Sequence, residues 1–239
     1  SGFFSGLVML FFLRNESSRY GKVELMTVLV ETWGVGKWLV ISGVFIGLAT
    51  QSQVYLVGVL SSTEEAGVVR ILQTFIQPAM LVFTAFSALA TPVIVNDYVL
   101  KNYLSMRRKV FLFILLSGGM AFVYECLLIL FGNSLNNTLF DGKYSVYSNQ
   151  ILIWGTIPII WSLFWGGVIA LQSIKKPHTL VIISGVWASI SLISGLIFIP
   201  ISGVWGATIS IVAGYVAALL STWILYWVMV HRKYTVLEA

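Results

Sequence analysis

Long apolar runs separated by short polar segments make up most of the sequence. A helix needs about 20 apolar residues to cross the roughly 30 Å of hydrocarbon in a bilayer. A first apolar run, residues 1–13, is too short to span, and no basic stretch precedes it as in a signal peptide. We interpret it as the end of a transmembrane helix, which would make the chain part of a longer protein. The predicted full spans are residues 38–60, 67–95, 110–131, 151–174, 179–200 and 204–230.

The basic residues alternate between the segments that connect these spans. Lys143 falls on one side and Arg70 inside a span, while the other basic residues share the second side, which the positive-inside rule makes cytoplasmic. Segments 61–66, 132–150 and 201–203 then face outward, and the C-terminus is cytoplasmic. The cytoplasmic set is Arg14, Arg19, Lys22, Lys37, Lys101, Arg107, Arg108, Lys109, Lys175, Lys176, Arg232 and Lys233.

Composition agrees with a membrane protein. Apolar residues make up 58% of the chain and charged residues only 10%, against about 25% charged in soluble domains. A single cysteine, Cys126, excludes a disulfide scaffold, and the scattered basic residues do not predict nucleic-acid binding. We predict an all-α polytopic membrane helix bundle. Residues 1–37 form the end of a helix and a cytoplasmic connection, with or without an interfacial helix, and residues 38–239 form a six-helix lobe.

Small residues recur at helical spacing in three spans, as in helices that pack closely in lipid. The runs are Gly43 and Gly47; Ser184, Ala188, Ser191 and Gly195; and Gly206, Ala207, Ser210, Gly214, Ala218 and Thr222. Plain helix packing is the interpretation we favour for them.

A polar stripe follows the second span. Ser62 and Glu65 form a capping-box pattern, so the helix is expected to begin near Thr63. Pro78 and Pro92 are expected to kink it. A polar stripe on a kinked helix avoids lipid, so it faces either a water-filled cavity or a neighbouring helix. The stripe comprises Arg70, Gln73, Gln77, Thr84 and Thr91, and the preceding span adds Gln51 and Gln53 near mid-membrane.

The fourth span carries Trp161, Trp165 and Gln172 on one helical face. Core packing and an apolar or sugar-stacking wall are both open for this face. Trp38, Trp154, Trp205 and Trp227 are expected in the interfacial belts that tryptophan favours.

Enzyme signatures are not found. His178 and His231 match no metal-ligand spacing, and nucleophile-elbow, phosphate-loop and dinucleotide patterns do not occur. The intramembrane charges are Arg70 and Glu125, which lie at similar depth on consecutive spans. Three arrangements are open: an ion pair, an Arg70 that faces a cavity and meets an anionic substrate, or neither. Polar stripes and kinked helices without catalytic groups favour a transporter.

Several short stretches, in their order and sidedness, resemble a known family over nearly the whole chain. They are Gly36-Lys37-Trp38 before the first full span, Glu65-Ala66-Gly67 before the proline-containing helix, Asp141-Gly142-Lys143-Tyr144 before the fourth span, Lys175-Lys176-Pro177 at an inner turn, and Gly203-Val204-Trp205-Gly206-Ala207-Thr208 at the last helix.

The chain thereby resembles the C-terminal half of bacterial polysaccharide flippases, the Wzx-like O-antigen transporters of the MOP superfamily, which are relatives of MATE exporters. The resemblance implies one lobe of a two-lobed transporter in the bacterial inner membrane. It implies transport of a lipid-linked oligosaccharide on undecaprenyl pyrophosphate, with the missing N-terminal lobe and polysaccharide assembly proteins as partners. No cofactor is implied beyond a coupling ion, H⁺ or Na⁺.

Two alternatives are retained. A cation-coupled MATE-type exporter of small molecules would need a buried carboxylate, and Glu125 is the mid-span candidate. A membrane-embedded polysaccharide polymerase or ligase would be expected to carry a long outer loop rich in Arg and His. The longest predicted outer loop, 132–150, contains Lys143 and no histidine, which disfavours that enzyme.

Overall fold

A computed structural model describes residues 22–140, 147–173 and 178–237, and every regular element in these ranges is helical. The predicted helix end at residues 1–13 lies outside the described residues. The helices are α2 (Lys22–Leu60), α3 (Thr63–Val99), α4 (Tyr103–Phe140), α5 (Ser148–Gly155), α6 (Ile157–Ser173), α7 (His178–Ser202) and α8 (Val204–Leu237).

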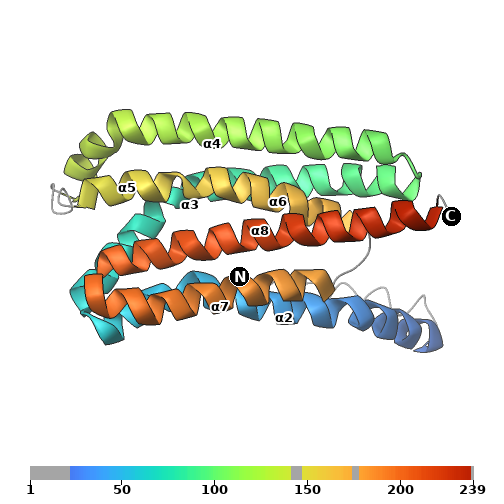
Figure 1. Cartoon of the computed structure of the whole chain (residues 1–239), viewed down its shortest axis with the longest axis horizontal. Helices are drawn as coiled ribbons and strands as arrows, with labels where there is room; N and C mark the ends of the chain where they lie inside the picture. Colours follow the sequence, from blue (N-terminus) through green and yellow to red (C-terminus); the bar gives the residue numbers. More distant parts are fainter. Residues whose placement is uncertain (1–21, 141–146, 174–177, 238–239) are drawn as a thin grey trace.

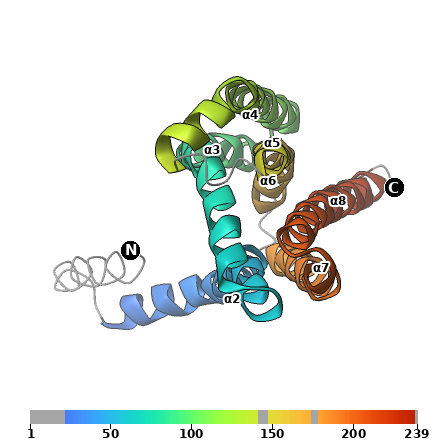
Figure 2. The ribbon, with the colours of Figure 1, turned by 90° about the vertical axis from the view of Figure 1, so that its left-hand side faces the viewer.

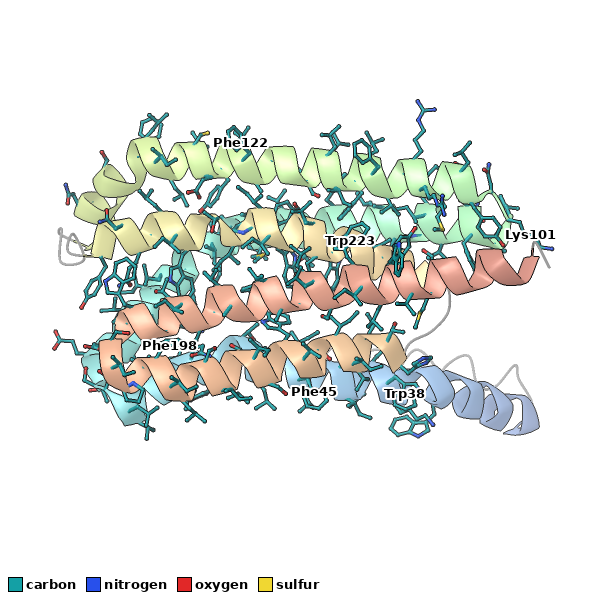
Figure 3. The ribbon with its side chains drawn as sticks, in the orientation of Figure 1. Trp38, Phe45, Lys101, Phe122, Phe198 and Trp223 are labelled. Carbon is teal, nitrogen blue, oxygen red and sulfur yellow. The ribbon has the colours of Figure 1, made fainter. Side chains whose placement is uncertain are left out.

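Six stretches of the described residues are long and apolar enough to cross a bilayer. They lie in α2, α3, α4, the α5–α6 pair, α7 and α8, which confirms the six predicted spans and a multi-pass membrane bundle. Large apolar side chains such as Phe122 and Phe198 project outward from the bundle, where lipid would cover them (Figure 3).

The connections between helices alternate between the two ends of the bundle (Figure 1). One end carries the short turns at residues 61–62 and at Gly203, together with the end of α4 and the start of α5. The other end carries the α3–α4 turn with Lys101, whose φ of 59° closes it (Figure 3). This alternation agrees with the up-and-down order that the charge pattern predicted.

The helices extend further into the predicted loops than expected. Residues 101–109 were expected to form a cytoplasmic loop, but α4 begins at Tyr103 and places Lys109 within hydrogen-bond distance of Asp97 on α3 (2.8 Å). Ser105 also donates to Asp97 (2.6 Å). These bonds tie the start of α4 to the end of α3. Helix α2 likewise runs through the expected domain boundary at residue 37 without a break.

The helices follow one another around the bundle in the order α2, α7, α8, α6, α4 and α3 (Figure 2). The most extensive contacts join α7 to α8 and α2 to α7. Helix α3 crosses from α2 to α4 and so closes the ring, while it also contacts α5, α6 and α8. Arg70 is one of the residues of α3 between its contacts with α2 and with α4.

Small residues explain the closest helix contacts. A Cβ at Gly214 of α8 would lie 2.9 Å from Trp187 of α7, and one at Gly195 would lie 2.8 Å from Gln53 of α2. The stripes predicted on α7 and α8 therefore do pack against neighbours. Gly43 and Gly47 do not pack against another helix as predicted, because no described residue lies within 4 Å of a Cβ at either position.

Helix α3 begins and bends as its sequence indicates. Ser62 is the N-cap, and its hydroxyl accepts a hydrogen bond from the Glu65 backbone N–H (3.1 Å). Pro78 and Pro92 lie inside the helix, which changes direction along its length (Figure 1). Each proline removes one backbone donor. Pro78 leaves the Thr74 carbonyl without its helical donor, and the Tyr124 hydroxyl of α4 donates to the neighbouring Phe75 carbonyl.

The fourth predicted span is not one helix. Helix α5 ends at Gly155, Thr156 bonds back to the Ile153 carbonyl through both its N–H and its hydroxyl (3.2 and 2.7 Å), and α6 begins at Ile157. The uniform apolar run concealed this break. Gly155 and Pro158 are the sequence signals that could have predicted it, because glycine suits a helix end and proline a first turn.

Candidate functional site

A polar cleft lies among α2, α3, α5 and α8, with a volume of about 130 Å³. We call it the Arg70 cleft. Its polar wall comes from α2 and α3, which carry Thr50, Gln51, Arg70, Gln73 and Gln77. Its remaining wall is apolar and aromatic, formed by Ala49, Ile76, Met80, Trp154, Ile211 and Tyr215.

The guanidinium of Arg70 is positioned by two glutamines. Its Nη1 donates to Gln73 Oε1 (3.0 Å) and to Gln51 Oε1 (3.3 Å). Gln73 Nε2 in turn donates to the Thr50 carbonyl (3.1 Å), which fixes the amide so that its oxygen points at Arg70. Gln73 can do this because it lies three residues, about one helical turn, beyond Arg70. The cation is thus held by neutral groups of two helices.

The positive charge of Arg70 is not compensated inside the cleft, because no aspartate or glutamate is among the residues that line it. Within the described part of the chain, the guanidinium nitrogens other than Nη1 make no hydrogen bond. The side chain is exposed to the cleft. Arginine binds phosphates and carboxylates through paired N–H donors. The arrangement can therefore accept an anion from the cleft side.

The polar residues predicted on α2 and α3 do not all meet in one place. Gln51, Arg70, Gln73 and Gln77 meet in the Arg70 cleft, but Gln53 does not. Gln53 is fully buried, and its Nε2 donates to the Ser191 carbonyl (2.7 Å) and hydroxyl (2.9 Å) on α7. Two residues along a helix turn the side chain by about 200°, so Gln51 and Gln53 face opposite ways. The lower part of the stripe, Thr84 and Thr91, bonds to carbonyls of its own helix, at Met80 and Ser87.

Trp161 lies at the centre of an aromatic cluster. Its ring centroid lies 5.0–5.9 Å from four other rings, at distances typical of favourable aromatic pairs. Trp161 lines neither this cleft nor the second one described below, so its surroundings favour the core-packing interpretation. The aromatic cluster consists of Trp161, Phe164, Trp165, Trp187 and Tyr215.

Trp165 and Gln172 line a second cleft, of about 160 Å³, between α2, α6 and α7. We call it the Gln172 cleft. Tyr215 lines the Arg70 cleft and Trp187 lines the Gln172 cleft, and the centroids of these two rings are 4.8 Å apart. The aromatic cluster therefore stands between the two clefts.

Three aromatic residues of this region were not predicted as site residues. Trp154 was expected at the membrane interface but is buried, and its Nε1 donates to Thr208 (3.0 Å) while its ring lines the Arg70 cleft. Trp187 and Tyr215 interrupt stretches of small and aliphatic residues. Trp187 packs against Gly214 in the small-residue stripe of α8. That stripe was the available signal, because small residues leave room for a large ring on the facing helix.

Arg70 and Glu125 are not joined by a hydrogen bond or an ion pair among the described residues. Arg70 points to its glutamines, while Glu125 is 8% exposed and its Oε2 has no partner. The structure therefore places the two intramembrane charges in separate surroundings.

Comparison with protein-family models, with curated proteins and with solved structures gives no match to this chain. Interpretation of the site therefore depends on its geometry and chemistry.

Proposed function

We propose that this chain is part of a membrane transporter that flips a lipid-linked oligosaccharide, carried on undecaprenyl pyrophosphate, across the cytoplasmic membrane. The observation that carries the proposal is Arg70, an uncompensated cation held by Gln51 and Gln73 in a cleft within the membrane-spanning helices.

A charged side chain inside a membrane span costs several kcal/mol and usually marks a functional site. Here no acidic residue in the cleft balances Arg70, which supports an anionic ligand rather than a structural ion pair. A pyrophosphate supplies two adjacent anionic groups for a guanidinium. Glutamine amides, such as that of Gln77, can bond to sugar hydroxyls.

The size of the Arg70 cleft limits what it can hold. A volume of about 130 Å³ has room for a small anionic group such as a phosphate but not for an oligosaccharide. We therefore propose that the oligosaccharide extends beyond this chain into a cavity that a second lobe completes. Arg70 lies seven residues after Thr63, about 10 Å along the helix from the end that the charge pattern makes external. The anionic group would thus be held in the outer half of the membrane.

Replacement of Arg70 tests the proposal. The gene for the full-length protein is deleted in its own host and restored with wild type, Arg70→Ala or Arg108→Ala. Arg108 is an exposed basic residue near the other end of the bundle and serves as the matched control. We expect Arg70→Ala to lose at least about tenfold in the rate at which polysaccharide reaches the surface, while lipid-linked precursor accumulates in the inner leaflet. Arg108→Ala should behave as wild type.

Full export by a membrane-inserted Arg70→Ala variant would contradict the proposal. Deletion that leaves polysaccharide unchanged but abolishes cation-dependent drug efflux would favour the MATE-type exporter instead. Precursor that reaches the outer leaflet but is not polymerised would favour a polymerase or ligase.

A further inference from the structure

We propose that Glu125, packed against the break between α5 and α6, is a proton-binding site inside the membrane-spanning part of the protein. The inference goes beyond the substrate proposed above and does not depend on it, because it concerns a different group of residues and no transported molecule.

The carboxyl group of Glu125 occupies the space that a side chain at Gly155 would fill. The residue is 8% exposed, and its Oε2 is enclosed without a hydrogen-bond partner among the described residues. The carboxylate points at Gly155, the last residue of α5, so closely that a Cβ at position 155 would overlap it. Leu128 closes the same space from α4, 3.0 Å from that Cβ position. The acid is therefore directed at the helix break itself.

The break offers carbonyl acceptors to a protonated carboxyl group. The end of a helix leaves carbonyl groups without intrahelical donors, and the start of a helix leaves N–H groups without acceptors. Helix α5 ends at Gly155 and α6 begins at Ile157. The N–H groups of Thr156, Ile159 and Ile160 are bonded to carbonyls of the same segment, whereas Pro158 has no N–H and leaves the Trp154 carbonyl without its usual helical donor. A protonated Glu125 can donate to a carbonyl of the break, and an ionised Glu125 has few free N–H donors there.

The charges around Glu125 favour a proton over a metal cation. Helices α3, α5 and α6 pack against α4, and the ranges of α5 and α6 contain no charged residue. On α3, Arg70 is bonded to its glutamines; on α4, the Tyr124 hydroxyl donates to Phe75. The other acids of α3 lie at its ends: Glu64 and Glu65 in the first turn, and Asp97 against Lys109.

Among the described residues, no three His, Cys, Asp or Glu side chains gather as a metal ion requires. A buried, unpaired carboxylate costs several kcal/mol and is relieved by taking up a proton. Binding of that proton would let Glu125 donate to a carbonyl of the break, and release of the proton would remove that hydrogen bond. Trp154, adjacent to Gly155, lines the Arg70 cleft, so the proton site touches the same segment as that cleft.

Chemical labelling tests the site. Membranes containing the full-length protein are treated with dicyclohexylcarbodiimide, which adds to protonated carboxyl groups in apolar surroundings, and peptides are analysed by mass spectrometry. We expect Glu125 to be modified at low pH, and the modification to fall about tenfold per pH unit above the midpoint of its titration. Asp97, held by Lys109, provides the internal control and should stay unmodified. The variant Glu125→Gln should lose the label.

Three results would overturn the proposal. They are no modification of Glu125 at any pH, modification that does not change with pH, which indicates a permanently neutral structural acid, and protection by Na⁺ at constant pH, which indicates a sodium site. Because the label is read as a mass on wild-type protein, the test does not require a folded variant. It also stands or fails separately from the flipping assay of Arg70→Ala.

Discussion

Gly206 of α8 lies against the backbone of Phe198 on α7, so closely that a Cβ at position 206 would overlap the Phe198 carbonyl group. The obstacle is backbone, which cannot rotate away as a side chain can. This contact allows α7 and α8, joined by the tight turn at Gly203, to form the most extensive helix pair of the bundle.

Replacement of Gly206 by alanine should therefore separate α7 from α8 and destabilise the protein by about 1–3 kcal/mol, the usual cost of overpacking. Thermal unfolding in detergent measures the effect. Gly119→Ala on α4 is the matched control, because no described residue lies within 4 Å of a Cβ there. Alanine at this position should leave stability unchanged or raise it by up to about 1 kcal/mol. Equal unfolding temperatures for the two variants would contradict the predicted clash.

Gln53 and Ser191 connect α2 to α7 and should be energetically coupled. Gln53→Ala removes two buried hydrogen bonds, at 2.7 and 2.9 Å, and Ser191→Ala removes one of them. In a double-mutant cycle we expect a coupling energy of about 1 kcal/mol, in the range found for hydrogen bonds between membrane helices. Strictly additive losses would show that the bond to the Ser191 hydroxyl contributes nothing, and that the carbonyl bond carries the contact.

The orientation of the bundle is predicted from the basic residues. Asn102 and Ser202 are exposed at opposite ends of the helices, in the α3–α4 turn and at the end of α7. In a Cys126→Ser background, Ser202→Cys should react with an impermeant thiol reagent added outside intact cells, and Asn102→Cys only after permeabilisation. The reverse pattern would invert the proposed topology.

The number and order of the spans could be predicted from the sequence because twenty-residue apolar runs have few alternatives in a membrane chain. Likewise, the Ser62 cap and the clustering of Arg70 with Gln73 and Gln77 follow from spacing along one helix. The break at Gly155 could not be read from hydropathy, which is uniform across it. Contacts between spans could not be predicted from the sequence either. Gln51 and Gln53 look equivalent in sequence, yet Gln51 bonds to Arg70 and Gln53 to Ser191.

The aromatic cluster leads to the last prediction. Trp187 and Tyr215 are in contact, with one ring facing each cleft, so together they separate the Arg70 cleft from the Gln172 cleft. If they form a barrier, removal of the Trp187 ring should connect the two spaces. Truncation of a buried tryptophan also costs about 3–5 kcal/mol, so Trp187→Phe accompanies Trp187→Ala as the milder variant.

A cysteine at position 172 reports on this connection. Gln172 lies near the end of α6 that the charge pattern makes cytoplasmic, so in a Cys126→Ser background Gln172→Cys should not react with an impermeant reagent added outside. Addition of Trp187→Ala should raise that external reactivity at least about tenfold, since a ring that fills the space between two clefts also blocks diffusion between them. Trp187→Phe should give an intermediate value, because a smaller ring blocks less of the passage.

Trp38→Ala, which removes an indole outside both clefts, controls for general loosening of the bundle. Unchanged reactivity in a folded Trp187→Ala variant would mean that other residues separate the clefts, whereas an equal rise in Trp38→Ala would assign the effect to loosening rather than to a barrier.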